Sequence, residues 1–306
     1  MQEMYVRSGD RELWTRCDGR EDGSPILFIA GANASGLMWP DEFIELFASA
    51  GFRAIRYDHR DTGRSTFRVF EECPYTVEDL ANDAIAILDG WRVKIAHVVG
   101  LSLGATIGQV LALDYPEWLV SVTLMCGAAL DVDFVGNIER AFSGESSPDE
   151  LPLPKRSVLE ALAQRSRNID NLDVALESRV NEWRILAGGK IPFNAEEFLE
   201  WERRSIEHAG SLTLPSNHAL AKPVAFARGE ELRSVTVPTL VIQGTEDPLN
   251  PPPHGKHIAD LIPSARLVEI EGLGHALPGY FHRVIAHEII RHAEQSHASD
   301  ARTSRG

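Results

Sequence analysis

The sequence predicts an α/β protein in which a mostly parallel central sheet is flanked by helices and carries an inserted helical cap. Short apolar segments alternate with helical patterns towards both ends of the chain, whereas strand signals are missing between residues 131 and 231. Strand–helix–strand alternation is typical of βαβ units, whose strands pair in parallel. We therefore expect a core formed by residues 1–130 and 232–306 and a cap formed by residues 131–231.

Six short segments rich in apolar and β-branched residues are the expected strands. They are Pro25–Ala30, Phe52–Tyr57, Ile95–Leu101, Val120–Cys126, Thr239–Gln243 and Leu267–Ile270. Their nearly continuous apolar character suits strands that are buried on both faces of a parallel sheet.

Helical patterns lie between and after these strands. Thr76–Leu88 begins with a candidate N-cap threonine and an acidic first turn. The other expected core helices run from Ser102 to Leu113, from His254 to Leu261 and from Phe281 to His292. In residues 131–231, helical pieces are separated by the breaker segments GESSPDELPLP, GGKIPF and SLTLP. We expect this insertion to cover the carboxyl edge of the sheet, where α/β proteins bind ligands; a helical elaboration without a binding role is the alternative.

Composition limits the possible partners. The net charge of −15 argues against nucleic acid, because phosphate binding requires a basic patch, and also against docking on anionic lipid. The three cysteines are widely spaced and form no zinc pattern, which indicates reduced thiols in a cytoplasmic protein. The first residues show no signal peptide, and no apolar run approaches the about 20 residues that a membrane span needs.

The motif Gly100-Leu101-Ser102-Leu103-Gly104 matches G-x-S-x-G, the nucleophile elbow. In this elbow the serine occupies a strained strand-to-helix turn that leaves no room for side chains two residues away on either side. The context supports the motif, because an expected strand precedes it and an expected helix follows. We therefore interpret Ser102 as a catalytic nucleophile.

A serine nucleophile on such a turn is followed along the chain by an acid and then by a histidine. The segment TLVIQGTEDPLNPP supplies Asp247, and LVEIEGLGHALP supplies His275. Asp247 would hold the imidazole in the correct tautomer, and His275 would act as the base. Glu246 is the nearest rival for the acid, and Asp131 or Asp133 is a more distant one.

The remaining histidines are weaker candidates for the base. His97 lies inside an expected strand and is predicted to be a packed core residue. Six others are predicted to lie at the surface or beside the site: His59, His254, His257, His282, His287 and His292. No HExxH motif or zinc-ligand spacing is present, so we expect no metal.

The tetrahedral intermediate also needs hydrogen-bond donors for its oxyanion. One is expected to be the backbone N–H of Leu103, the residue after the nucleophile. The other is expected from the small-residue turn FIAGANASG, where we assign the N–H of Ala32. The alternative is a plain turn that uses Gly31 for its backbone freedom.

Two further groups of residues lie near the expected site. The polar segment Arg56–Ser65 is expected to form a structural hydrogen-bond network, with substrate positioning as the alternative. Several large side chains could wall a pocket, although aromatic residues at helical spacing are more often core; they are Met38, Trp39, Trp183, Phe198 and Trp201.

The chain resembles the α/β-hydrolase superfamily over nearly its whole length, and within it the actinomycete anthracycline (aclacinomycin) methylesterases. The resemblance rests on stretches of both core and insertion: MWPDEF, IRYDHRDTGRST, AILDGW, AHVVGLSLGAT, NEWRILAG, WERRSIEHAG, VPTLVIQGTEDP, PHGKHIADLIP and GLGHALP. It implies an α/β-hydrolase fold and hydrolysis of a carboxymethyl ester on a tetracyclic polyketide.

Carried over by position, the resemblance places the nucleophile at Ser102, the acid at Asp247, the base at His275 and the oxyanion donors at Ala32 and Leu103. At the two donors the family commonly has Gly and Met, where this chain has Ala32 and Leu103. Both residues keep a backbone N–H, and leucine has about the volume of methionine. An apolar small-molecule ester is then the expected partner, no cofactor is needed, and the oligomeric state stays open. The same triad also serves lactonases, general carboxylesterases, C–C hydrolases and perhydrolases, and a non-catalytic ligand-binding protein is the remaining alternative.

Overall fold

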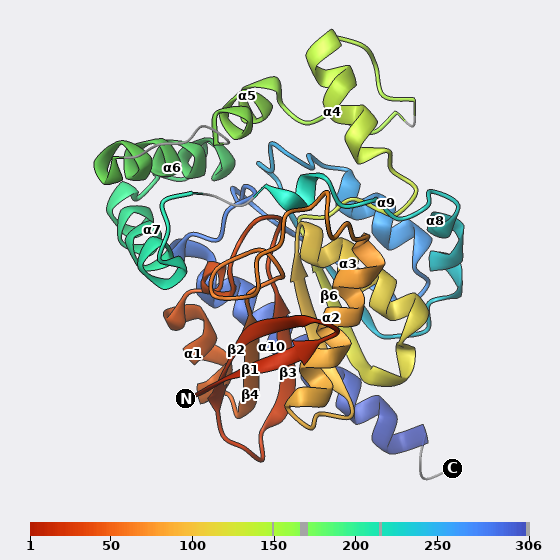
Figure 1. The fold of residues 1–306 in the computed structure, drawn as a ribbon. Helices are drawn as coiled ribbons and strands as arrows, with labels where there is room; N and C mark the ends of the chain where they lie inside the picture. The colour runs from red at the N-terminus through yellow and green to blue at the C-terminus, as the bar shows by residue number, and fades with distance from the viewer. Residues whose placement is uncertain (149, 166–170, 214–215, 304–306) are drawn as a thin grey trace.

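The computed structural model describes residues 1–148, 150–165, 171–213 and 216–303. An eight-stranded sheet lies at its centre, in the order β1-β2-β4-β3-β5-β6-β7-β8 (Figure 1). Its strands are β1 (Gln2–Ser8), β2 (Arg11–Gly19), β3 (Ser24–Ile29), β4 (Phe52–Tyr57), β5 (Ala96–Leu101), β6 (Leu119–Met125), β7 (Thr239–Gly244) and β8 (Ala265–Ile270). Neighbouring strands from β4 to β8 along the sheet are parallel, which confirms the mostly parallel α/β fold.

All six expected strands are present, with ends shifted by no more than two residues. The antiparallel hairpin of β1 and β2 at the edge of the sheet was not predicted. Both of its strands carry many charged residues, and most residues of β1 are exposed or half-buried, so a search for apolar runs passes over it.

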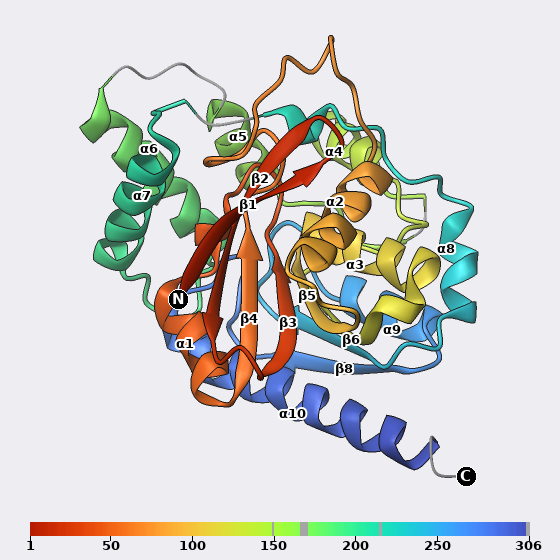
Figure 2. The ribbon, with the colours of Figure 1, turned by 60° about the horizontal axis from the view of Figure 1, so that its bottom comes forward.

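Helices cover both faces of the sheet. One face is covered by α2 (Val77–Gly90), α3 (Leu103–Asp114) and α9 (His254–Leu261), and the other by α1 (Asp41–Ser49) and α10 (Gly279–Thr303) (Figure 2). The prediction for Thr76 is confirmed: its hydroxyl accepts from the Asp79 amide while the Asp79 carboxylate accepts from the Thr76 amide. Helix α10 continues beyond the predicted end at His292, and α1 was not predicted.

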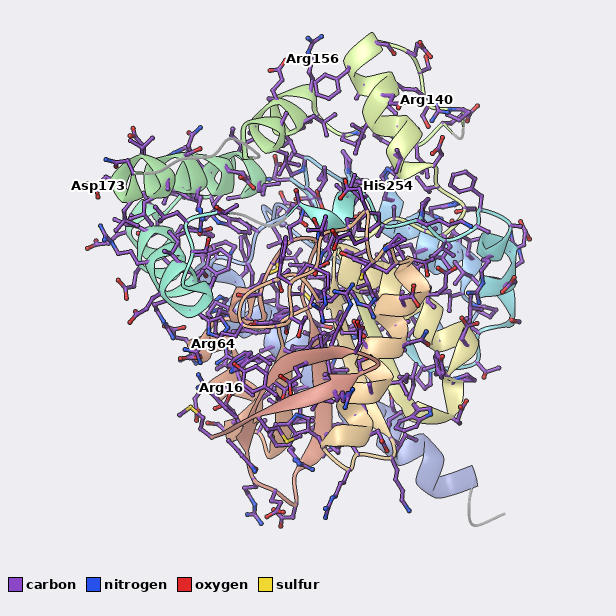
Figure 3. All side chains as sticks on the ribbon, in the orientation of Figure 1. Arg16, Arg64, Arg140, Arg156, Asp173 and His254 are labelled. Carbon is purple, nitrogen blue, oxygen red and sulfur yellow. The ribbon has the colours of Figure 1, made fainter. Side chains whose placement is uncertain are left out.

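Residues 131–231, called the cap segment below, are helical as expected. They contain α4 (Phe134–Ser143), α5 (Arg156–Arg165), α6 (Leu172–Leu186), α7 (Ala195–Ala209), the 3-10 turn η3 (Asn217–Ala219) and α8 (Arg228–Glu231). Within the described part of this segment, β pairing is limited to one bridge between Lys222 and Thr76. Helices α4 and α5 lie above the core in Figure 1, and α6 and α7 lie at its upper left. Figure 3 shows Arg140 on α4 and Asp173 on α6 at opposite ends of this group of helices.

Helix α8 lies against the core instead of above it. Arg228 donates to Asp114 at the end of α3, and the backbone of Gly229 approaches Asp131 so closely that a Cβ there would lie 2.3 Å from the Asp131 Cβ. The boundaries of the cap at residues 131 and 231 stay a prediction. None of the helices that the structure describes is long and apolar enough to cross a membrane.

Candidate active site

Ser102 occupies the sharp turn between β5 and α3. Its backbone has φ 57° and ψ −116°, a strained combination for a residue with a side chain. The glycines on either side make the turn possible, because a Cβ on Gly100 would lie 2.0 Å from the Gly104 carbonyl oxygen and one on Gly104 would lie 2.3 Å from the Ile29 carbonyl oxygen. The serine side chain is therefore presented at the end of a buried strand and is only half-buried itself.

Asp247 and His275 form a buried pair. Nδ1 of His275 lies 2.9 Å from Oδ2 and 3.1 Å from Oδ1 of Asp247. His275 is 5% exposed and Asp247 is 1% exposed. The amides of Leu249 and Asn250 donate to Oδ1 at 2.8 and 2.9 Å, which fixes the carboxylate in the turn after β7. With Nδ1–H donating to Asp247, Nε2 is the ring nitrogen left to accept a proton.

The three rival carboxylates have other places in the structure. Asp131 contacts His257, with both carboxylate oxygens 3.0 Å from Nε2. Asp133 caps α4 and pairs with Arg140. The backbone of Glu246 bonds to Leu273, and its side chain is half-buried next to Gly188. Among the described residues, Asp247 is thus the carboxylate that the fold brings to His275.

One cysteine, Cys126, lies close both to the turn at Ser102 and to the Asp–His pair. The Ser102 amide donates to the Met125 carbonyl at 2.9 Å, which places the serine beside the end of β6. The next residue, Cys126, is buried, and its Sγ lies within 4.8 Å of the ligand atoms of the Asp–His pair. Cys126 therefore connects the serine turn to the acid–base pair, a contact that the sequence analysis missed.

Cys126, Asp247 and His275 are also the described side chains that could hold a metal ion together. Burial, and then the charge of Asp247, raise the pKa of the Cys126 thiol well above its ordinary value. A protonated thiol is a poor ligand, and Nδ1 of His275 is already engaged by Asp247. The chemistry of this group suits a hydrogen-bonded acid–base pair better than a metal centre.

The second predicted oxyanion donor lies in the turn after β3. The turn is closed by the Ala34 amide, which donates to the Gly31 carbonyl at 3.4 Å, and it leaves Ala32 exposed. It borders the nucleophile, because a Cβ on Gly31 would lie 3.5 Å from the Ser102 Cβ. On the other side, Leu103 is the first residue of α3, so its N–H has no acceptor within the helix.

The segment from Arg56 to Ser65 forms the predicted hydrogen-bond network. Arg60 makes a bidentate ion pair with Asp83 at 2.6 and 2.7 Å, and Asp61 accepts from Arg11 at 3.0 Å. Asp58 is fully buried and accepts from the Gly36 amide at 2.8 Å while lying 2.7 Å from Nε2 of His208. This network joins the core to the cap segment, which contributes His208.

Four of the six histidines predicted to lie at the surface or beside the site are buried: His59, His254, His282 and His292. His97 is a core residue 2.8 Å from the Ser121 hydroxyl, as predicted. The surface alternative was wrong for His59, which is 0% exposed and donates from Nε2 to the Ala30 carbonyl at 3.0 Å. His218 was not considered in the sequence analysis, and no local signal marks it; its contacts are described below.

A cavity of about 400 Å³ lies between the cap segment and the core. Met38, Trp183, Phe198 and Trp201 line it together with Leu277, two residues after His275. Trp39 is instead a core residue stacked on Phe43, with ring centroids 5.6 Å apart. A larger and more open groove of about 650 Å³ runs between α6 and α7 and is lined by none of the predicted site residues.

Comparison with known proteins shows the family of the chain. Residues 24–278 match the family model described as the alpha/beta hydrolase fold. The chain is 48% identical to rhodomycin D methylesterase DauP of Streptomyces sp. strain C5 and 46% identical to rhodomycin D methylesterase DnrP of Streptomyces peucetius. Both matches cover 95% of this chain and 98% of the relative.

Solved structures give the same fold at lower identity. An esterase from Exiguobacterium antarcticum superposes with a TM-score of 0.72 at 18% identity, over 96% of this chain and 100% of the other. At this identity the likeness concerns the fold alone.

Proposed function

The chain belongs to the alpha/beta hydrolase fold family and is a carboxylic ester hydrolase related to the rhodomycin D methylesterases, and on that premise we propose that it removes the methyl group from a carboxymethyl ester on a polycyclic aromatic polyketide such as an anthracycline. The observation that carries this proposal is 48% identity over 95% of the chain, because such a match includes the cap segment as well as the core. A match confined to the core would support hydrolase chemistry without indicating a substrate.

In the proposed first half-reaction, the Ser102 hydroxyl attacks the ester carbonyl carbon while Nε2 of His275 takes the hydroxyl proton. The amides of Ala32 and Leu103 stabilise the negative charge that develops on the carbonyl oxygen. Asp247 holds the ring with Nδ1–H towards itself and stabilises the imidazolium. His275 then protonates the departing methoxide. Methanol leaves, and the acyl group stays bound to Ser102.

In the second half-reaction, water attacks the acyl-enzyme on the same path. His275 takes a proton from the water, and the tetrahedral intermediate again places its oxyanion at the two amides. The proton returns to the Ser102 oxygen as the acyl bond breaks, and the product is the free carboxylic acid. Every proton is carried by His275, so the reaction as proposed needs no cofactor.

A cavity bordered by Leu277, two residues after His275, supports a small-molecule substrate with an aromatic ring system. This cavity of about 400 Å³ presents tryptophan and phenylalanine side chains, which suit a flat ring system, and charged side chains from Glu42, Glu197, Glu200 and Arg204. All three cysteines are free, which supports the reducing cytoplasm as the compartment of the protein.

The test is to incubate the protein with an anthracycline carboxymethyl ester and to measure methanol and the free acid by mass spectrometry. Ser102→Ala serves as the matched control, because the change removes one oxygen from a half-buried side chain. We expect methanol and acid in equal amounts from the wild-type protein and a rate lower by on the order of 10⁴-fold or more from the variant.

Two outcomes would contradict the proposal at different levels. A wild-type protein that is labelled by a fluorophosphonate at Ser102 but releases no methanol would keep the serine hydrolase and remove the proposed substrate. An undiminished rate in Ser102→Ala would remove the nucleophile assignment itself.

A further inference from the structure

His218, on η3 of the cap segment, contacts the oxyanion turn of the core across 185 positions of sequence. Its Nδ1 accepts a hydrogen bond of 2.8 Å from the amide of Asn33. In return, the His218 amide donates to Oδ1 of Asn33 at 3.3 Å. The histidine is 7% exposed, so these two bonds form a reciprocal clamp with little competition from water.

The other ring nitrogen defines the protonation state of His218. Nε2 lies 3.1 Å from the Arg60 carbonyl oxygen, which can only accept, so Nε2 carries the proton. Nδ1 is then the acceptor that the Asn33 amide requires. Burial, followed by the neighbouring His59, lowers the pKa of His218 to about 3, so the ring stays neutral at ordinary pH.

The clamped residue follows the predicted oxyanion donor directly. Asn33 has φ 60°, in the left-handed region that few residues other than glycine, asparagine and aspartate adopt. The N–H of Ala32 belongs to the peptide between Gly31 and Ala32. On one side of that peptide, the Gly31 amide donates to Sδ of Met38 at 3.2 Å; on the other side, the Asn33 amide donates to His218.

From this geometry we propose that His218 is a positioning residue that aims the Ala32 N–H at the developing oxyanion by holding the neighbouring peptide in place. The proposal rests on the function proposed above. His218 touches neither the nucleophile nor the acid–base pair among the contacts that the structure describes, so it acts through the turn and not on the reacting atoms. The cap segment then contributes to the chemical step as well as to the walls of the cavity.

A second histidine supports the same turn from the core. His59 donates from Nε2 to the carbonyl of Ala30, at the end of β3, and its ring meets the ring of His218 edge-on at 5.2 Å. Burial lowers the pKa of His59 as well, so this ring is also neutral. The turn is thus held before and after Ala32 by two neutral imidazoles in contact with each other.

A matched pair of substitutions separates positioning from general stability. In His218→Asn, the amide oxygen can take the place of Nδ1 and accept from the Asn33 amide. In His218→Gln, the amide nitrogen can take the place of Nε2 and donate to the Arg60 carbonyl, but the Asn33 amide loses its acceptor. Each variant keeps one of the two side-chain bonds, so the two should lose similar stability.

We expect kcat for p-nitrophenyl acetate to fall by about 10-fold to 100-fold in His218→Gln, because a displaced oxyanion donor stabilises the transition state poorly. In His218→Asn we expect a loss of less than about fivefold, and KM should change little in either variant. Inhibition by 1,1,1-trifluoro-4-phenylbutan-2-one, whose serine adduct carries an oxyanion, should weaken in parallel with kcat/KM. Asn217, which precedes His218 on η3, donates to Asp61 and Arg68. Asn217→Ala removes these two bonds and is the control for local destabilisation.

The proposal is overturned if His218→Gln and His218→Asn lose activity equally, or if Asn217→Ala lowers kcat as much as His218→Gln. Should neither His218 variant fold, the nitrogen NMR shifts of the His218 ring in the wild-type protein test the clamp, because Nδ1 must be the unprotonated ring nitrogen to accept from the Asn33 amide. A protonated Nδ1 would then reject the proposal. A wild-type protein that neither hydrolyses the ester nor reacts with a fluorophosphonate would instead reject the proposed function.

Discussion

Two parts of the site beside Ser102 differ in what holds them. The core holds Asp247 and His275, whereas the cap segment helps to hold the turn at Ala32. The Asp247 carboxylate is fixed by amides of its own loop. Among the described residues, the cap supports this part of the site through backbone bonds, from the His275 amide to the Leu186 carbonyl at 2.7 Å and from the Lys155 amide to the Pro248 carbonyl at 2.8 Å. The oxyanion turn depends on a cap side chain, His218. In the proposed mechanism, charge stabilisation therefore depends on a cap side chain, whereas proton transfer depends on a core loop that the cap supports only through its backbone.

This difference predicts which changes affect which half of the chemistry. Loss of the His218 contact should weaken oxyanion stabilisation while leaving the Asp–His bond intact, and damage to the loop after β7 should do the reverse. The predictions that follow test this division, beginning with the largest effect.

Asp247→Asn is expected to lower kcat by on the order of 10⁴-fold, because the amide favours the wrong tautomer of His275. The asparagine Oδ1 can still accept from the amides of Leu249 and Asn250, so the loop should keep its shape. Ester hydrolysis and circular dichroism of the variant check both statements. A loss of less than 10-fold would place the acid at another carboxylate, with Glu246 as the first to test.

Gly274→Ala tests the contact between the end of α6 in the cap and the loop that carries His275. A Cβ at residue 274 would lie 2.3 Å from the backbone of Leu186 and Ala187, and backbone atoms cannot rotate away. We expect kcat to fall by about 100-fold and the free energy of unfolding by about 1–3 kcal/mol, because the His275 loop or the end of α6 must shift.

The matched control for this prediction is Gly189→Ala, two residues beyond Ala187. A Cβ at residue 189 meets nothing within 4 Å, so both activity and urea stability should stay close to wild type. Equal effects of the two alanines on kcat would show that the end of α6 does not constrain His275.

Much of the acid–base side could be predicted from the sequence, and little of the cap support could. Ser102, Asp247 and His275 each follow a strand, and parallel strands bring their carboxyl ends to one edge, so chain order predicted the Asp–His pair that the structure contains. His218 lies in a segment without periodicity, and its partner is 185 residues away. Only the folded backbone brings the two together.

The same limit explains why the surface alternative failed for His59. His59 is fully buried, and His208 and His218 of the cap segment contact its loop at Asp58 and Arg60. Burial of this kind arises from tertiary packing and leaves no local pattern. The missed strands β1 and β2 are a different case from His59. In β2, part of the alternation between buried and exposed positions is matched by apolar and polar residues, which the sequence shows.

The buried histidines of the oxyanion side predict a pH dependence of stability. The folded-state pKa of His218 is about 3, below the ordinary value of about 6.5 in an unfolded chain. Between these values the unfolded state binds the extra proton, so stability that is present above about pH 6.5 is lost as the pH falls. Each such histidine contributes up to about 1.4 kcal/mol per pH unit.

Urea unfolding at pH 7.5, 6 and 5 should therefore show the stability advantage of the wild type over His218→Asn shrinking as the pH falls. The expected change between pH 6 and pH 5 is about 1 kcal/mol, because one titrating group has been removed. Parallel stability curves for the two proteins would mean that His218 is not held neutral by the fold. His59, whose pKa is also lowered, is present in both proteins and cancels in the comparison.

Met38→Leu should have the smallest effect, although Met38 and His218 hold the two ends of the same turn. The thioether is a weak acceptor for the Gly31 amide, and leucine preserves its volume, so we expect a loss of about 1 kcal/mol in stability and less than about a threefold change in kcat. Kinetics with p-nitrophenyl acetate beside His218→Gln provide the comparison. If Met38→Leu lowered kcat as much as His218→Gln, support from the core would matter as much as support from the cap, and the division between the two sides of the site would no longer hold.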